Sequence, residues 1–150
     1  MVCCGLSMGV DRIYQPIALS IILKNLKEEE VMTDNVVIAL SCGTNDTNRA
    51  TRAIHLATIA HKEGKNTSLF LLDEGVYLAK EGIITHVRAA TGDVADDLLA
   101  YLQAHGVPIL VCTPCASARQ IKEDDLIEGA RMASAAEFIN MSCDATVISL

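Results

Sequence analysis

The chain has 150 residues, of which 51% are hydrophobic and 21% are charged. This is enough for one folded domain with its own core, and it is not the composition of a disordered chain. The formal net charge of −7 and the absence of a Lys/Arg cluster argue against nucleic acid as a partner. The chain has only 3% aromatic residues and no Trp, so it lacks the usual side chains on which bases or flavins stack.

The first 31 residues are expected to form an N-terminal extension. Their apolar run over residues 16–23 is too short to cross a membrane. The charged stretch KNLKEEE follows it, where a signal peptide would have small residues at a cleavage site. The extension is interpreted either as an amphipathic helix or as a segment outside the native domain, because the regular pattern begins only after Met32. No membrane partner is expected.

From Met32 onward, short apolar runs alternate with helical patterns, which predicts βαβ units and a parallel sheet. Strands are predicted at residues 35–42, 67–72, 107–112 and 145–150, with a short one at 130–133. Helices are predicted at residues 45–64, 76–80, 93–106 and 134–141, whereas residues 82–90 are ambiguous. The sequence therefore predicts a single three-layer α/β/α domain over residues 32–150.

Three of these helices carry further sequence signals. The first has N-cap candidates at Asn45, Asp46 and Thr47, and an apolar face made of Ala50, Ala53, Ile54, Ala57 and Ala60. The helix over residues 93–106 is predicted to bury Val94, Leu98, Tyr101 and Leu102. Ser134 and Glu137 have the spacing of a capping box for the last helix.

In open parallel sheets, ligands bind outside the carboxyl ends of the strands. Three segments are predicted to meet at that edge: residues 41–45, residues 73–75 and residues 112–115. Two of them contain cysteine. This edge is therefore the predicted site.

Cofactor and metal sites fit this edge poorly. The only C-x-x-C pair and the four histidines do not have the spacing of a zinc site. The loop SCGTNDTNRA resembles a phosphate loop, but its polar residues are equally explained as helix caps, and Asp46 would repel a phosphate. We therefore expect no metal and no cofactor.

Thiol chemistry is the stronger hypothesis. Cys112 ends a predicted buried strand and precedes a helix that begins at Pro114, so we expect it to be exposed and its thiolate to be stabilised by the helix. Cys115 is expected one turn further in and less accessible. Arg119 lies another turn along and could favour a nearby anion. The remaining cysteines are interpreted as small structural residues, except Cys42 on the first loop.

The chain from Met32 to Leu150 resembles the DsrE/DsrF-like family of small sulfur-relay-related proteins. The resemblance rests on ALSCGTNDTNRA, LFLLDEGVYLAKEG, HGVPILVCTPCASARQI and AAEFINMSCDATVISL, taken in order along the chain. It implies a flavodoxin-like, mostly parallel sheet of about five strands, a homotrimer or homohexamer, and a cytoplasmic location, where thiols stay reduced. A thioredoxin resemblance is set aside because the C-x-x-C motif lies too far along the chain.

In the sulfur-relay branch, the cysteine that matches Cys112 accepts a persulfide sulfur from a donor protein and passes it to an acceptor protein. The predicted site therefore has Cys112 as the catalytic residue and Cys115 and Cys42 as supporting or resolving residues. Its predicted pocket residues are Asn45, Glu74, Gly75, Thr113 and Arg119. Cys115 and Cys42 depart from the one-thiol pattern, so two alternatives stay open: a dithiol redox protein that uses Cys112 and Cys115, and a non-catalytic oligomer that binds a small anion.

Overall fold

The computed structural model describes residues 33–150, and the predicted extension over residues 1–31 lies outside them. One five-stranded sheet with the order β4-β3-β2-β1-β5 forms the centre of this part of the chain, and all its strand pairs are parallel. The strands are β1 (Asn35–Leu40), β2 (Asn66–Leu71), β3 (Ile109–Cys112), β4 (Ala130–Ala133) and β5 (Thr146–Ser149). The predicted α/β class is confirmed, including the short strand β4.

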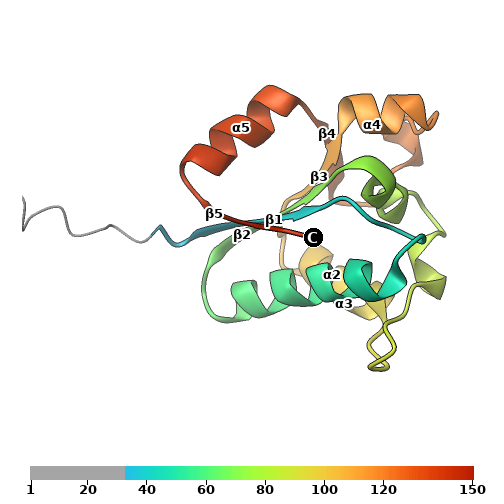
Figure 1. The fold of residues 1–150 in the computed structure, drawn as a ribbon, viewed down its shortest axis with the longest axis horizontal. Helices are drawn as coiled ribbons and strands as arrows, with labels where there is room; N and C mark the ends of the chain where they lie inside the picture. Colours follow the sequence, from blue (N-terminus) through green and yellow to red (C-terminus); the bar gives the residue numbers. More distant parts are fainter. Residues whose placement is uncertain (1–32) are drawn as a thin grey trace, which may run out of the picture. The chain divides into compact units, whose positions relative to one another are not determined.

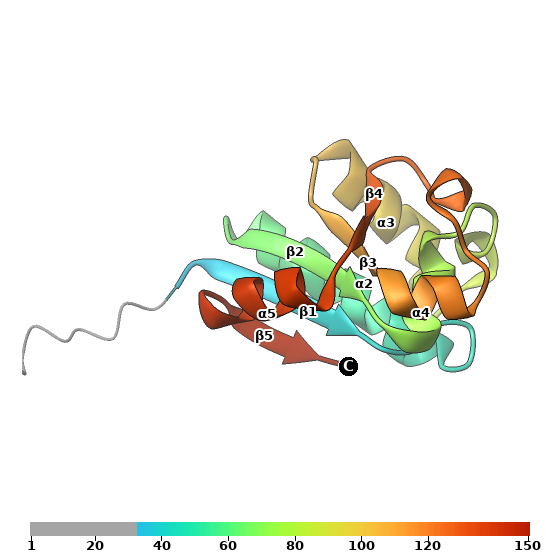
Figure 2. The same ribbon diagram turned by 90° about the horizontal axis from the view of Figure 1, so that it is seen from above.

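Helices cover both faces of the sheet (Figure 1). They are α2 (Thr47–Lys62), α3 (Ala95–Ala104), α4 (Thr113–Ala118) and α5 (Ala135–Cys143), with the 3₁₀ helices η1 (Asp73–Ala79), η2 (Ile84–His86) and η3 (Glu123–Asp125). α2 and α3 lie on one face, and α4 and α5 lie on the other. Figure 2 shows β5 and β4 at the two edges of the sheet. This is the predicted three-layer arrangement.

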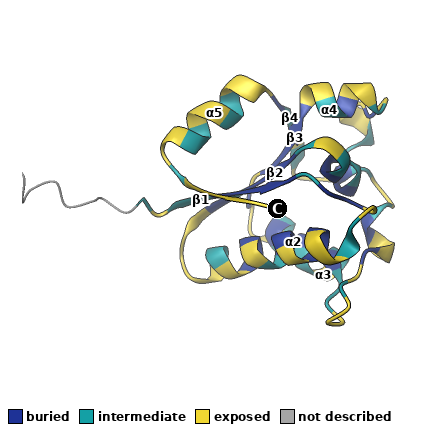
Figure 3. Cartoon of the chain, in the orientation of Figure 1, coloured by how far each residue is buried: buried dark blue, intermediate teal, exposed yellow. Residues whose placement is uncertain are grey.

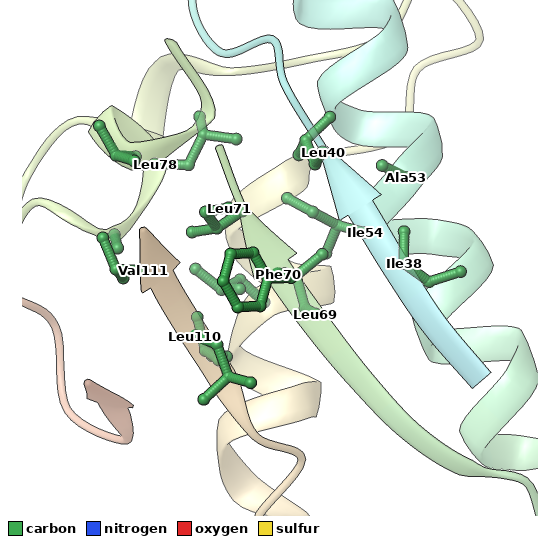
Figure 4. Close-up of a cluster of buried hydrophobic side chains, with 14 of the residues drawn as sticks. Ile38, Leu40, Ala53, Ile54, Leu69, Phe70, Leu71, Leu78, Leu110 and Val111 are labelled. Carbon is green, nitrogen blue, oxygen red and sulfur yellow. The ribbon is translucent and has the colours of Figure 1, made fainter. Parts of the chain in front are cut away.

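The three central strands are apolar on both faces because helices cover both (Figure 3). Figure 4 shows Ile38 and Leu40 of β1 beside Ile54 of α2, with Phe70 of β2 close by. All four of these side chains are fully buried. On the other face, the Phe70 ring lies 4.5 Å, centroid to centroid, from the Phe138 ring of α5. The core thus holds the carboxyl ends of β1, β2 and β3 in fixed positions, and these ends carry the predicted site.

Helix α2 follows the prediction closely. The side chain of Asp46 is its N-cap and accepts a hydrogen bond from the Arg49 N–H at 3.0 Å. Four of its five predicted face residues are buried, the exception being Ala60.

Two predicted details are wrong. Helix α3 buries Ala95 and Leu99 together with Leu102, because it is turned by about one residue from the predicted face. Residues 73–79, predicted to be helical only from Val76, form a 3₁₀ helix that starts directly after β2. The Asp73 carboxylate is thereby placed at the sheet edge.

The last part of the chain is less well covered. Helix α5 has no fully buried residue, although the Ser134 hydroxyl caps it as predicted by accepting the Glu137 N–H at 3.1 Å. The Glu137 carboxylate pairs with Arg131, and this hydrogen bond is the main cause that lowers the pKa of Glu137. The ion pair takes the place of the hydrogen bond to the Ser134 backbone N–H that would complete the predicted capping box. Ile139 is 59% exposed, and Val147 and Ile148 of β5 are each 38% exposed. An apolar surface therefore remains on α5 and β5.

Candidate functional site

The predicted edge is built from two loops that touch through their backbones. The contact needs glycine at two positions. A Cβ on Gly43 would lie 2.4 Å from the Glu74 carbonyl oxygen of η1, and one on Gly75 would lie 2.5 Å from the Leu40 carbonyl oxygen of β1. The Glu74 N–H also donates to the Ser41 oxygen at 3.2 Å. Gly75 is thus a packing residue that fixes where the acidic residues before it lie.

The two cysteines of the C-x-x-C motif lie together in the first turn of α4, at the carboxyl end of β3. Cys112 is the last residue of β3 and the N-cap residue of α4, and Pro114 lies in the first turn as predicted. Cys112 pairs with Ala133 of β4 and is only 6% exposed, whereas Cys115 is partly exposed. The predicted order of accessibility is therefore wrong, because the Cys112 side chain continues the buried pattern of β3 and Cys115 lies on the outer side of the turn.

The acidity of Cys112 also differs from the prediction. Burial is the main cause that raises the pKa of the Cys112 thiol, and the neighbouring Cys115 and Asp73 raise it further. The backbone N–H of Cys115 offsets part of this increase without forming a cap hydrogen bond to the sulfur. Burial of Cys112 therefore has a larger effect on its pKa than the N–H groups of the six-residue helix α4. The predicted stabilisation of the Cys112 thiolate is wrong.

Asp73 lies at the edge, in the segment predicted to reach it, although it was not named individually as a site residue. Its carboxylate oxygen Oδ1 lies 3.8 Å from the sulfur of Cys115, which donates a weak hydrogen bond to it. Its φ of +42° is in the left-handed region, which is uncommon for any residue except Gly, Asn and Asp. The position directly after an apolar strand was the available signal. Asp73 thus contacts the Cys115 sulfur directly, and its charge also contributes to the raised pKa of Cys112.

Arg119 is held in an ion pair within the same edge. Its Nη2 lies 2.6 Å from Oε1 of Glu74, and its Nη1 donates to the Cys115 carbonyl oxygen at 3.1 Å. The hydrogen bond to Glu74 is the main cause that raises the pKa of Arg119. The guanidinium also lies 5.9 Å from the centroid of the Tyr77 ring. The structure thus brings Glu74 and Arg119 together with Cys115, as predicted, but the charge of Arg119 is already balanced.

The other predicted residues have structural partners. The Thr113 hydroxyl donates to the Ala133 carbonyl oxygen at 3.0 Å and ties α4 to β4. The Asn45 side chain is exposed and accepts the Gly43 N–H at 2.8 Å, so it shapes the loop before α2. Neither side chain contacts the two cysteines of α4 through a hydrogen bond. They support the edge rather than line a pocket around the thiols.

Cys42 lies apart from this cysteine pair. It follows β1, and β2 separates β1 from β3, which places the two strands about 10 Å apart. A disulfide needs Cα atoms within about 7 Å. Burial raises the pKa of Cys42, with Asp46 as the next cause. Cys42 is thus a buried core thiol, and Cys143 is exposed at the end of α5. Among residues 33–150, no group of three or more His, Cys, Asp or Glu side chains could hold a metal ion.

A family model matches the chain over residues 34–149, and its description is the DsrE/DsrF-like family. The chain belongs to this family. Among curated proteins, the uncharacterized protein MJ0989 of Methanocaldococcus jannaschii is 38% identical over 93 residues, which are 61% of this chain and 76% of that protein. The uncharacterized protein MK0008 of Methanopyrus kandleri is 29% identical over 110 residues, which are 71% of this chain and 85% of that protein. The resemblance found in the sequence is confirmed.

A solved structure has a similar fold. The crystal structure of the ychN protein from E. coli has a TM-score of 0.65 and 21% sequence identity, and the match covers 79% of this chain and 100% of that one. At this identity the likeness concerns the fold alone. Within residues 33–150, none of the helices combines the length and the apolar character needed to cross a bilayer.

Proposed function

We propose that this DsrE/DsrF-like protein transfers sulfur and carries it as a persulfide on Cys112. The observation that supports this most directly is the position of Cys112 at the carboxyl end of β3, 6% exposed and with a second thiol at the i+3 position. A labile S–S bond needs shelter from free thiols, and the buried position supplies it. Family membership is consistent with a sulfur relay.

The chemistry requires only thiol exchange. The Cys112 sulfur attacks the outer sulfur of a donor persulfide R–S–SH, the S–S bond of the donor breaks, and R–SH departs with the proton that Cys112 loses. No net oxidation or reduction takes place. The proposal implies one donor protein and one acceptor protein, and a reducing compartment such as the cytoplasm, because the thiol must be free again after each transfer.

The experiment uses the reduced full chain and a sulfurtransferase that carries a persulfide. We expect the wild type to gain one sulfur atom, located by peptide mapping on Cys112 and retained after the donor is removed. Cys112→Ser should retain none. Cys143→Ser is the matched control, because Cys143 is an exposed thiol at the end of α5 and lies outside the site. This variant should behave like the wild type. A wild type that gains no sulfur would contradict the function.

A dithiol redox role for Cys112 and Cys115 is the second candidate. The i, i+3 spacing in one helical turn places their Cα atoms close to the ~5–6 Å that a disulfide accepts. The same mass experiment separates the two functions, since a redox pair loses two hydrogen atoms on mild oxidation and gains no sulfur. Anion binding is less well supported, because Arg119 is already paired with Glu74 at 2.6 Å.

We also propose that the protein forms a homotrimer or homohexamer. The mean hydropathy of +0.32 is high for a chain of this size. Three of the five large apolar side chains that are exposed within residues 33–150, Ile139, Val147 and Ile148, lie on α5 and the edge strand β5, and the other two lie on α2. A second copy of the chain would remove this surface from water.

A further inference from the structure

We propose that Cys115 is the thiol through which sulfur enters and leaves the site, and that Cys112 stores it. This inference rests on the sulfur-transfer function and assigns the two cysteines different steps. It reverses the order of access that the sequence suggested. It also gives Cys115 a direct role in transfer, beyond that of a resolving thiol.

The accessibility of the two sulfurs carries the argument. Thiol exchange requires the attacking sulfur to contact the outer sulfur of the donor. Cys112 is 6% exposed and lies among core residues, so the persulfide of a donor protein reaches it poorly without an intermediate carrier. Cys115 is partly exposed in the same turn of α4. A donor that docks on this edge therefore meets Cys115 first.

The charges around Cys115 favour onward transfer. A persulfide is more acidic than a thiol and is anionic at neutral pH, so on Cys115 it would lie beside the Asp73 carboxylate, which is 3.8 Å from that sulfur. Like charges at this distance repel each other. Glu74 adds no further net charge because Arg119 pairs with it. Sulfur on Cys115 is thus more accessible and lies directly beside a carboxylate, whereas sulfur on Cys112 is sheltered from other thiols.

Both steps balance without an added oxidant or reductant. In the first, Cys115–SH reacts with R–S–SH, the donor S–S bond breaks, and Cys115–S–SH and R–SH form. In the second, the Cys112 sulfur attacks the outer sulfur of Cys115–S–SH; the new S–S bond forms on Cys112 as the one on Cys115 breaks. The proton of Cys112 ends on the Cys115 sulfur. Release to an acceptor runs these steps in reverse.

The test compares loading rates of the reduced full chain with a persulfide-carrying sulfurtransferase as donor. Samples are quenched over time, and sulfur is located by peptide mapping in the wild type, Cys115→Ser and the control Cys143→Ser. We expect sulfur to reach Cys112 at least tenfold more slowly in Cys115→Ser and at the wild-type rate in Cys143→Ser. Urea unfolding of each variant checks that the fold is intact.

Cys112→Ser supplies the second measurement. It should show sulfur on Cys115 while the donor is present and lose it to a small acceptor thiol such as glutathione that is added once the donor is removed. Equal loading of Cys112 in the wild type and Cys115→Ser would overturn the inference and leave the sulfur-transfer function standing. The absence of sulfur on Cys115 at every time point in Cys112→Ser would also overturn it. A wild type that never gains sulfur contradicts the function itself, which is a different result.

Discussion

Replacing Gly75 with alanine should destabilise the protein by a clash that can be worked out from the structure. The new Cβ would lie 2.5 Å from the Leu40 oxygen, whereas ordinary contact begins near 3.4 Å, so the backbones must separate by most of an ångström. The same oxygen accepts the Leu72 N–H at 2.8 Å, and this hydrogen bond would weaken. Overpacking costs about 1–3 kcal/mol and a hydrogen bond about 1 kcal/mol, which gives about 2–4 kcal/mol of lost unfolding free energy.

Urea unfolding measures this loss, and Gly64→Ala is the matched control. A Cβ on Gly64 would meet nothing within 4 Å, but the residue has a φ of +77°, so its replacement tests backbone strain without a clash and should cost about 1–2 kcal/mol. Gly75→Ala should also speed the alkylation of Cys115, since Asp73 and Glu74 shift with the loop, whereas Gly64→Ala should not. The reasoning is refuted if Gly75→Ala is no less stable than Gly64→Ala and leaves Cys115 unchanged.

Two other predictions concern the thiols and the surface. Burial raises the pKa of Cys42 and Cys112, so the folded state holds these protons more tightly than the unfolded chain. The free energy of unfolding should therefore be highest below the ordinary cysteine pKa and fall as the pH rises above it. Urea unfolding from pH about 7 to about 10 should show a smaller fall in the free energy of unfolding for Cys42→Ser than for Cys143→Ser. Light scattering should give a particle mass several times the 16.1 kDa of one chain. Ile139→Lys should lower this mass more than Leu56→Lys on α2 does. A wild-type particle mass of 16.1 kDa would contradict self-assembly.

Much of the fold could be predicted from the sequence because its signals are local. The β-branched run of β1 and the capping residue Asp46 each specify an element without reference to the rest of the chain. The face of α3 could not be predicted in the same way. Val94 and Ala95 are adjacent, so the burial of Ala95 in place of Val94 depends on how α3 is rotated against the sheet, and the periodicity of the sequence does not specify that rotation.

The site was predicted to the level of segments and not of atoms. Strand ends and the C-x-x-C spacing placed Cys112, Glu74 and Arg119 at one edge, and the structure agrees. Exposure was predicted in the wrong order, because it depends on which way β3 turns its last side chain as α4 begins. The segment that contains Asp73 was predicted to reach the edge, but its contact with Cys115 was not, because the left-handed backbone of Asp73 has no signature in the sequence.

The balance of charge at this edge separates sulfur transfer from anion binding. Glu74 and Arg119 cancel each other at 2.6 Å, which leaves the exposed Asp73 carboxylate as the net charge next to Cys115. A free anion would have to displace Glu74 to reach the guanidinium, and it would meet the Asp73 carboxylate on the way. At about 4 Å, two like charges repel by about 1 kcal/mol even in water. A persulfide presented by a docked protein is under less of this constraint, because contacts elsewhere in the interface can hold it against Cys115. The charges at this edge therefore support the proposed exchange of sulfur with a protein partner over the binding of a small anion.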